Sequence, residues 1–365
     1  MMSRVAFVVN GDPSSPMGQR ASEFAKRLSG FDVRCVFRRG SKGVAALRIL
    51  RDLIALRPGV CCVFDHGFDG VLATVAYSRT HCTPWILDTG DNIVALGAAL
   101  GRSGASRIAT EWLDRLGERS AARIVVRGRG HQDVYASRGI TASWIPDGVD
   151  VKQFAARLLP DEPSDERPLV IGLIGSSHWH GPNVTFYGED LIDVVSDLML
   201  REYFAVPVRG VMIGDGSGIP VLKQRLRERG LEDIVTFLGR RDYNELPGLL
   251  ASMHVCLSTQ TDDSVGAVRT TGKLPLYLAA GRFVIASCVG EAARVLPTAM
   301  LVSYDGTHDT AYASRVADRI RELVGMNTSF RFRQECVDIA HVNFDYDRLA
   351  RRYSDLIAEV LNSRA

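Results

Sequence analysis

The fold is decided by the stretch Pro160-Asp-Glu-Pro-Ser-Asp-Glu-Arg-Pro168-Leu-Val-Ile-Gly-Leu-Ile174, where one pattern of strands and helices has ended and a second begins. Prolines and acidic residues dominate its first nine positions, which is typical of a linker. Its last six positions form a continuous apolar run of strand length, which indicates a strand buried on both faces. The sequence therefore predicts a linker over 151–168, between domains at 1–150 and 169–343.

Similar apolar runs alternate with segments of helical period on both sides of this linker. The order predicts parallel sheets covered by helices, so the expected class is α/β with two doubly wound, Rossmann-like domains. The segment 344–365 is strongly amphipathic and is expected to form a helix that needs a surface to lie on. The expected strands cover 5–9, 33–37, 60–64, 85–87, 123–126 and 143–145 before the linker, and 169–174, 210–213, 235–238, 255–258, 283–286 and 300–302 after it.

Charge is distributed unevenly along the 365 residues. Through Arg157 there are 22 Lys and Arg against 14 Asp and Glu, a net charge of +8, whereas the remainder carries 22 against 28, or −6. A basic first half attracts phosphates, anionic lipid surfaces or anionic polymers. The arginines of 38–57 suit peripheral contact with an anionic membrane, and a solvated helix face is the alternative. No aromatic residues interleave with these arginines as a nucleic-acid platform requires, so no nucleic-acid partner is expected.

The sequence also bears on location. No uncharged apolar run of about 18 residues occurs, and Met1-Met2-Ser3-Arg4-Val5 leads into a strand without a cleavage site. We therefore expect a cytoplasmic protein, with peripheral association at the inner face of the membrane as an open alternative. The seven cysteines are scattered without a C-x-x-C pair, and we expect buried thiols rather than metal ligands.

Candidate ligand residues follow the strands, because open parallel sheets bind ligands beyond the carboxyl ends of their strands. In the second domain, small residues at 175–178 and the turn Gly214-Asp-Gly-Ser-Gly218 would let backbone amides approach a phosphate, or would simply form turns. In Arg269-Thr270-Thr271-Gly272-Lys273, a helix beginning near Thr270 would bring hydroxyls, amides and two cations to one diphosphate. The alternative leaves Lys273 as an exposed helix residue.

The first domain offers different chemistry. The segment 9–20, which contains Gly11 and Arg20, has neither a Walker motif nor G-x-G-x-x-G, so P-loop hydrolysis and ordinary dinucleotide binding lose support. His66, Asp88 and Asp91 follow predicted strands. Their side chains would either hydrogen-bond an acceptor hydroxyl or cap the next helix.

The order of these segments resembles the family 4 glycosyltransferases of the GT-B fold. The resemblance is carried by Ser143-Trp-Ile-Pro146-Asp147-Gly148-Val149-Asp150, by the turn at 214–218 and by Leu276-Tyr-Leu-Ala-Ala-Gly281-Arg-Phe-Val-Ile-Ala-Ser287. It implies two domains that face each other across a cleft, with the C-terminal helix crossing back to the first. It further implies retaining, metal-independent transfer of a sugar from a nucleoside diphosphate to a glycan, lipid-linked or small-molecule acceptor, without a cofactor.

Positions carried over from the family give the candidate site. The family's two donor-segment glutamates fall on Val268 and Leu276, so a degenerate binding or scaffold protein and a nucleotide-sugar epimerase stay as alternatives. No metal ligand is expected. The expected catalytic residues are Asp91, Asp88 and His66, and the expected acceptor-binding residues are Gly11 and Arg20. The expected donor-binding residues are Gly175, Ser176, Ser177, His178, Gly214, Asp215, Gly216, Arg240, Arg269, Thr270, Thr271 and Lys273.

Overall fold

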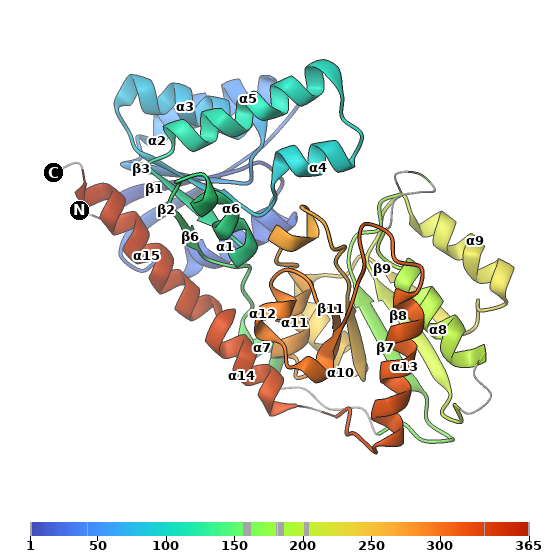
Figure 1. Cartoon of the computed structure of the whole chain (residues 1–365). Helices are drawn as coiled ribbons and strands as arrows, with labels where there is room; N and C mark the ends of the chain where they lie inside the picture. The colour runs from blue at the N-terminus through green and yellow to red at the C-terminus, as the bar shows by residue number, and fades with distance from the viewer. Residues whose placement is uncertain are drawn as a thin grey trace. The chain divides into compact units, whose positions relative to one another are not determined.

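The computed structural model describes residues 2–41, 43–155, 162–179, 181, 186–200, 204–331 and 333–363. They form two compact units (Figure 1). Unit 1 comprises Met1–Gly148, Val268–Thr270 and Phe344–Ala365, and unit 2 comprises Val149–Ala267 and Thr271–Asn343. Each unit contains one six-stranded sheet, and every pairing between its strands is parallel.

The sheet of unit 1 has the strand order β2-β1-β3-β4-β5-β6. Val5 of β1 pairs with Val33 of β2 on one side and with Val60 of β3 on the other, so the chain reverses its direction of growth between β1 and β3. The strands are β1 (Ser3–Val9), β2 (Phe31–Phe37), β3 (Val60–Phe64), β4 (Trp85–Thr89), β5 (Arg123–Val126) and β6 (Ala142–Trp144).

Helices cover both faces of this sheet because every second side chain of a strand points to the same face. On one face, Val8 and Val63 pack with α2 (Val44–Leu56), α3 (Phe68–His81) and α5 (Gly104–Ser120). On the opposite face, Phe7 and Phe64 pack with α1 (Pro16–Arg27) and α15 (Tyr346–Asn362). The remaining helices of unit 1 are α4 (Ile93–Ala99) and α6 (Arg129–Ser137).

The C-terminal helix α15 is part of the core of unit 1, as its amphipathic sequence predicts. Its buried side chains recur at helical spacing, among them Leu349, Tyr353 and Ile357. The Tyr353 ring lies 4.9 Å from that of Phe24 and 6.0 Å from that of Phe7, measured between centroids. Aromatic contacts at these distances stabilise the packing beyond the area they bury.

The sheet of unit 2 has the order β12-β11-β10-β7-β8-β9. Its strands are β7 (Leu169–Ile174), β8 (Val208–Ile213), β9 (Val235–Gly239), β10 (Val255–Ser258), β11 (Phe283–Ser287) and β12 (Leu301–Val302). Its α-helices are α7 (Val151–Ala155), α8 (Glu189–Leu200), α9 (Ile219–Arg229), α10 (Leu246–Ala251), α11 (Lys273–Ala279), α12 (Ala292–Val295), α13 (Tyr312–Gly325) and α14 (Gln334–Asn343).

Three details differ from the sequence expectations. Helix α11 begins at Lys273 rather than near Thr270, because an earlier start would place Pro275 beyond the first turn, where its missing N–H group would be needed and its ring would clash with a carbonyl. Residues 151–155 of the predicted linker form α7, and its residues 156–161 lie outside the described ones. Cys82 and Cys288 are exposed, so the expectation of buried thiols is wrong for these two.

Candidate donor site at the edge of the second sheet

The sheet of unit 2 changes its direction of growth between β7 and β10. The chain runs from β7 to β8 and β9 on one side, and returns through β10 to β11 and β12 on the other. Doubly wound sheets bind ligands beyond the carboxyl ends of the two strands at such a switch point. In unit 2 these ends carry the loop 175–179 after β7, and Thr259 and Gln260 after β10.

The loop after β7 interlocks with the turn after β8. The Gly175 amide donates to the Ile213 carbonyl oxygen at 3.0 Å, and the Ser177 amide donates to that of Asp215 at 2.8 Å. Gly216 has φ +133°, and a Cβ there would lie 2.0 Å from the Ser177 carbonyl oxygen. Only glycine fits this approach. The predicted pair of small-residue loops therefore forms one compact structure at the switch point.

Tyr187 connects the two strand ends. The Lys273 ammonium nitrogen lies 3.7 Å from the centroid of the Tyr187 ring. The Tyr187 hydroxyl accepts a hydrogen bond of 2.9 Å from Gln260 Nε2. A Cβ on Gly175 would lie 3.4 Å from Tyr187 Cδ2, so the ring also borders the loop after β7. Tyr187 was not among the sequence candidates, because its position in the loop before α8 shows no motif.

Lys273 is the buried cation of this region. The side chain is 6% exposed, and its Nζ has no hydrogen-bond partner among the described residues. The Ser177 hydroxyl is likewise buried without a hydrogen-bond partner in the described part of the chain. Buried polar groups are normally satisfied, and an ammonium that only an aromatic face neutralises is costly. Both groups are suited to receive the oxygens of an anionic ligand.

The structure divides the predicted cluster 269–273 between the units. Arg269 belongs to unit 1, where its Nε donates to Asp91 Oδ1 at 2.5 Å. The buried Thr270 hydroxyl donates to the Arg127 carbonyl oxygen at 2.6 Å, also in unit 1. Thr271 belongs to unit 2, with its hydroxyl 3.3 Å from that of Ser258. In this structure the Thr270 hydroxyl donates to a backbone carbonyl, and its role in phosphate binding stays a prediction.

The other donor candidates keep their predicted places after the strands of unit 2. Ser176, His178 and Asp215 are exposed in the interlocked loops, and Arg240 is exposed directly after β9. Gly214 has φ +147°, and a Cβ there would lie 2.0 Å from the Gly175 carbonyl oxygen. These positions stay predictions for donor contacts.

Two first-domain candidates, Arg20 and Asp88, form a buried structural pair. Arg20 Nη2 donates to Asp88 Oδ2 at 2.9 Å, and the same guanidinium donates to the carbonyl oxygens of Ile145 and Pro146 at 2.7 and 2.5 Å. Both side chains are at most 1% exposed. Neither group reaches solvent in this structure, and the roles of Arg20 as an acceptor ligand and of Asp88 as a catalytic group stay predictions.

His66 is also buried, and its catalytic role stays a prediction. Its ring packs against α5, with Nε2 3.3 Å from the Leu113 carbonyl oxygen, and burial lowers the pKa of His66 to about 4. A second imidazole, His131 on α6, is also buried. Burial lowers the pKa of His131 to about 4, and the nearby Asp91 charge acts in the opposite direction. Sequence reasoning missed His131, although it follows β5, the neighbour of β4 in the sheet.

Asp91 and Gly11 remain as first-domain candidates. Asp91 is partly exposed and pairs with Arg269. Gly11 lies in the turn after β1, where a Cβ would come within 2.4 Å of Ser15 Oγ, the group that caps α1. Gly11 thus has a packing reason to be glycine, and its contact with an acceptor stays a prediction.

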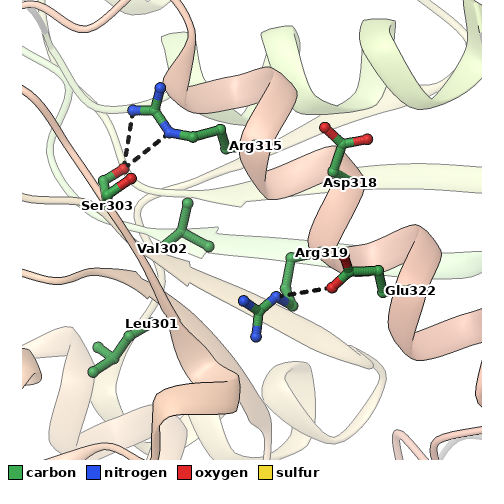
Figure 2. A pocket seen from close by; sticks show the side chains of 7 residues that line it. All are labelled: Leu301, Val302, Ser303, Arg315, Asp318, Arg319 and Glu322. Atoms are coloured by element: carbon green, nitrogen blue, oxygen red, sulfur yellow. Dashed lines mark hydrogen bonds and ion pairs between the residues drawn. The ribbon is translucent and has the colours of Figure 1, made fainter.

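A pocket of about 200 Å³ lies beside β12 and α13, away from the switch point (Figure 2). Arg315 donates from Nε and Nη2 to the Ser303 carbonyl oxygen at 3.3 and 3.0 Å, and Arg319 pairs with Glu322 at 3.4 Å. These arginines are bound to protein acceptors, so we do not assign this pocket to the donor. Within the described ranges, no group of three or more His, Cys, Asp or Glu side chains is placed to hold a metal ion.

Comparison with known proteins gives a family match and a fold match. Residues 170–323 match the family model described as Glycosyl transferases group 1. The structure of HepE from Anabaena in complex with UDP and glucose is similar with a TM-score of 0.72 and 16% identity, covering 98% of this chain and 100% of HepE. Sucrose-phosphate synthase from Thermosynechococcus elongatus gives a TM-score of 0.73 at 14% identity, covering 99% and 100%. No curated protein sequence matches the chain.

These findings agree with the architecture. The matched residues run from β7 into α13 and contain the whole sheet of unit 2. The similar structures share the two-sheet arrangement along nearly the whole chain, which confirms the expected α/β class. Residues 170–323 are therefore similar to the group 1 glycosyl transferases, and the chain as a whole has the two-domain α/β fold of the similar structures, the GT-B fold.

Proposed function

We propose that unit 2 binds a nucleoside diphosphate sugar at the carboxyl ends of β7 and β10, and that the sugar passes to an acceptor bound by unit 1. The structure of HepE with UDP-glucose supports a nucleotide-sugar donor. The proposed reaction retains the anomeric configuration and uses no metal ion and no cofactor. The acceptor is a glycan, a lipid-linked sugar or a small molecule, and the basic first half of the chain favours an anionic one.

The observation that carries this proposal is the buried Lys273 ammonium without a hydrogen-bond partner among the described residues. A diphosphate oxygen would supply that partner. Negative charge grows on the departing diphosphate in the transition state, and a fixed cation in a site with little water stabilises it strongly. The amides of the loop after β7 and the Ser177 hydroxyl would complete the phosphate contacts.

The unit 1 residues have a separate proposed role. Asp91 is partly exposed at the carboxyl end of β4, where an acceptor hydroxyl would find a carboxylate oxygen. Arg269 pairs with that carboxylate and orients it. We therefore place Asp91 on the acceptor side of the reaction, and Lys273 on the donor side.

Titration calorimetry with UDP, GDP and ADP tests the donor site. One nucleoside diphosphate should bind, and Lys273→Met should weaken it roughly 10- to 150-fold, because a charged hydrogen bond contributes about 1.5–3 kcal/mol. Lys223→Met is the matched control, since Lys223 is exposed on α9 and only approaches the Phe237 ring, at 6.0 Å. Binding that survives Lys273→Met unchanged, or no binding of any nucleotide by the parent protein, would refute the proposal.

Two further measurements address the reaction. Nucleotide binding and sugar transfer should persist in EDTA, and loss of both would contradict the metal-independent mechanism.

Val268 and Leu276 are buried where the family's glutamates would stand, so turnover must be measured directly. Release of nucleoside diphosphate that depends on an acceptor supports transfer. Binding without turnover would instead indicate a degenerate protein, and sugar conversion without an acceptor would indicate an epimerase.

A further inference from the structure

Helices α2, α3 and α5 form one layer on the sheet of unit 1, with α3 in contact with the other two (Figure 1). Their inner side chains share a single core cluster that includes Leu53, Val71 and Leu113. Because the three inner faces pack on the same side of the sheet, the three outer faces point away from it together. The layer therefore presents one continuous outer surface, which we call the α2–α3–α5 face.

The α2–α3–α5 face is unusually apolar for a solvated surface. Seven large apolar side chains on these helices are exposed, and Leu47 and Trp112 are 70% and 52% exposed. Ile108 and Trp112 border a pocket of about 500 Å³. Clustered exposed apolar groups mark interaction sites. The seven residues are Val44, Leu47, Ile54, Phe68, Leu72, Ile108 and Trp112.

Arginines accompany these apolar side chains. On α5 the exposed residues Ile108, Trp112, Arg115 and Arg119 follow helical spacing and form one stripe. The most exposed acidic side chains of the three helices are Asp52, Glu111 and Glu118, which are 43%, 31% and 13% exposed, and each pairs with an arginine at 2.8–3.3 Å. The six exposed arginines are Arg48, Arg51, Arg79, Arg107, Arg115 and Arg119.

We propose that the α2–α3–α5 face docks unit 1 onto a bilayer that contains anionic lipids. The apolar side chains enter the boundary between headgroups and acyl chains, and the arginines bind lipid phosphates while their stems lie along the apolar surface. A second copy of the chain is a poorer occupant, because pairing two such faces brings like charges together. The surface extends the contact expected for 38–57, since α3 and α5 supply most of its aromatic and basic groups. The inference does not depend on the proposed donor site.

Sedimentation with phosphatidylcholine vesicles, with and without about a third phosphatidylglycerol, tests this proposal. The protein should bind the anionic vesicles, less tightly in high salt, and barely bind the neutral ones. Neutralising two arginines in Arg115→Gln/Arg119→Gln should weaken binding roughly 25-fold, about five-fold for each. Trp112 fluorescence should shift to the blue on binding, and Trp112→Phe should abolish most of that shift.

Matched controls lie on unit 2. Arg321→Gln and Met326→Ser change an exposed arginine and an exposed apolar side chain at and beyond the end of α13, and neither should alter vesicle binding. Vesicle affinity that Arg115→Gln/Arg119→Gln and Trp112→Ser both leave unchanged would overturn the proposal. So would equal binding to neutral and anionic vesicles, or a dimer without vesicles that Trp112→Ser dissociates. Circular dichroism and thermal unfolding of the unit 1 variants show whether unit 1 remains folded.

Discussion

Replacing Asp88 by asparagine removes the central charge of a buried cluster in unit 1. The carboxylate accepts hydrogen bonds from Arg20 Nη2 at 2.9 Å and from Arg127 Nε at 3.2 Å. Asparagine retains the shape of the side chain but not its charge. Both guanidinium groups would then be buried with a weaker partner, and the variant isolates the electrostatic contribution of Asp88.

The contacts around Asp88 determine the expected loss of stability. Removing one partner of a buried ion pair costs about 3–5 kcal/mol. The Asp147 carboxylate lies 3.4 Å from Arg20 and 3.8 Å from Arg127, so one negative charge remains, which favours the lower end of that range. A loss of about 3 kcal/mol corresponds to a melting temperature lower by roughly 6–12 °C for a unit of this size.

Scanning calorimetry of the full chain, with hydrogen exchange to assign each transition, measures the effect. The transition of unit 1 should move down and that of unit 2 should stay in place. Asp32→Asn is the matched control, because Asp32 pairs with Arg4 and Arg34 at the surface and its loss should leave the transition unchanged. Unchanged unfolding of Asp88→Asn together with abolished sugar transfer would refute this reasoning and support a catalytic role for Asp88.

Three further outcomes are expected. Gly216→Ala should weaken nucleotide binding in calorimetric titration, because its Cβ would overlap the Ser177 carbonyl, whereas Gly248→Ala in α10 has open space and an ordinary φ and should not. His131→Asn should flatten the dependence of unit 1 stability on pH in urea unfolding. Because the pKa of His131 is lowered, the folded state binds the His131 proton less readily than the unfolded state does. The contribution of His131 to stability is therefore complete above about pH 6.5, and up to about 3 kcal/mol is lost as the pH falls toward 4. An unchanged slope of stability against pH would contradict this reasoning. Tyr353→Ala should destabilise unit 1 by about 3–5 kcal/mol in urea unfolding, and a smaller loss would show that the α15 packing is loose.

The strands were well predicted because continuous apolar runs determine buried parallel strands. The runs at 60–64, 123–126, 169–174 and 255–258 have the same bounds in the structure. The short helix α4 was missed, since seven residues give little periodicity. The ends of the strands were predicted less accurately than their centres, and this affected the interpretation of Asp88. Strand β4 continues to Thr89, so Asp88 is a strand residue rather than a loop residue.

Burial of charged residues was the feature of the candidate site that the sequence did not predict. Arg20 lies four positions before Phe24, on the inner stripe of α1, and this spacing was the available signal that it faces the core. The role of Tyr187 depends on loops far apart in the sequence meeting at Gly175 and Gln260, which no local pattern reports. Lys273 was found because the sequence places it with Arg269 and two threonines near the expected start of a helix, although that helix begins at Lys273 itself.

Helix α15 closes the core of unit 1 with residues that are about 340 to 360 positions later than β1 in the chain. During synthesis on the ribosome, the strands of unit 1 emerge first but lack one wall of their core until α15 leaves the exit tunnel. Nearly all of unit 2 is made in the meantime and has its own contiguous sheet. The half of the protein translated first is therefore the half that matures last, and it is the one exposed to chaperones and proteases in the interval.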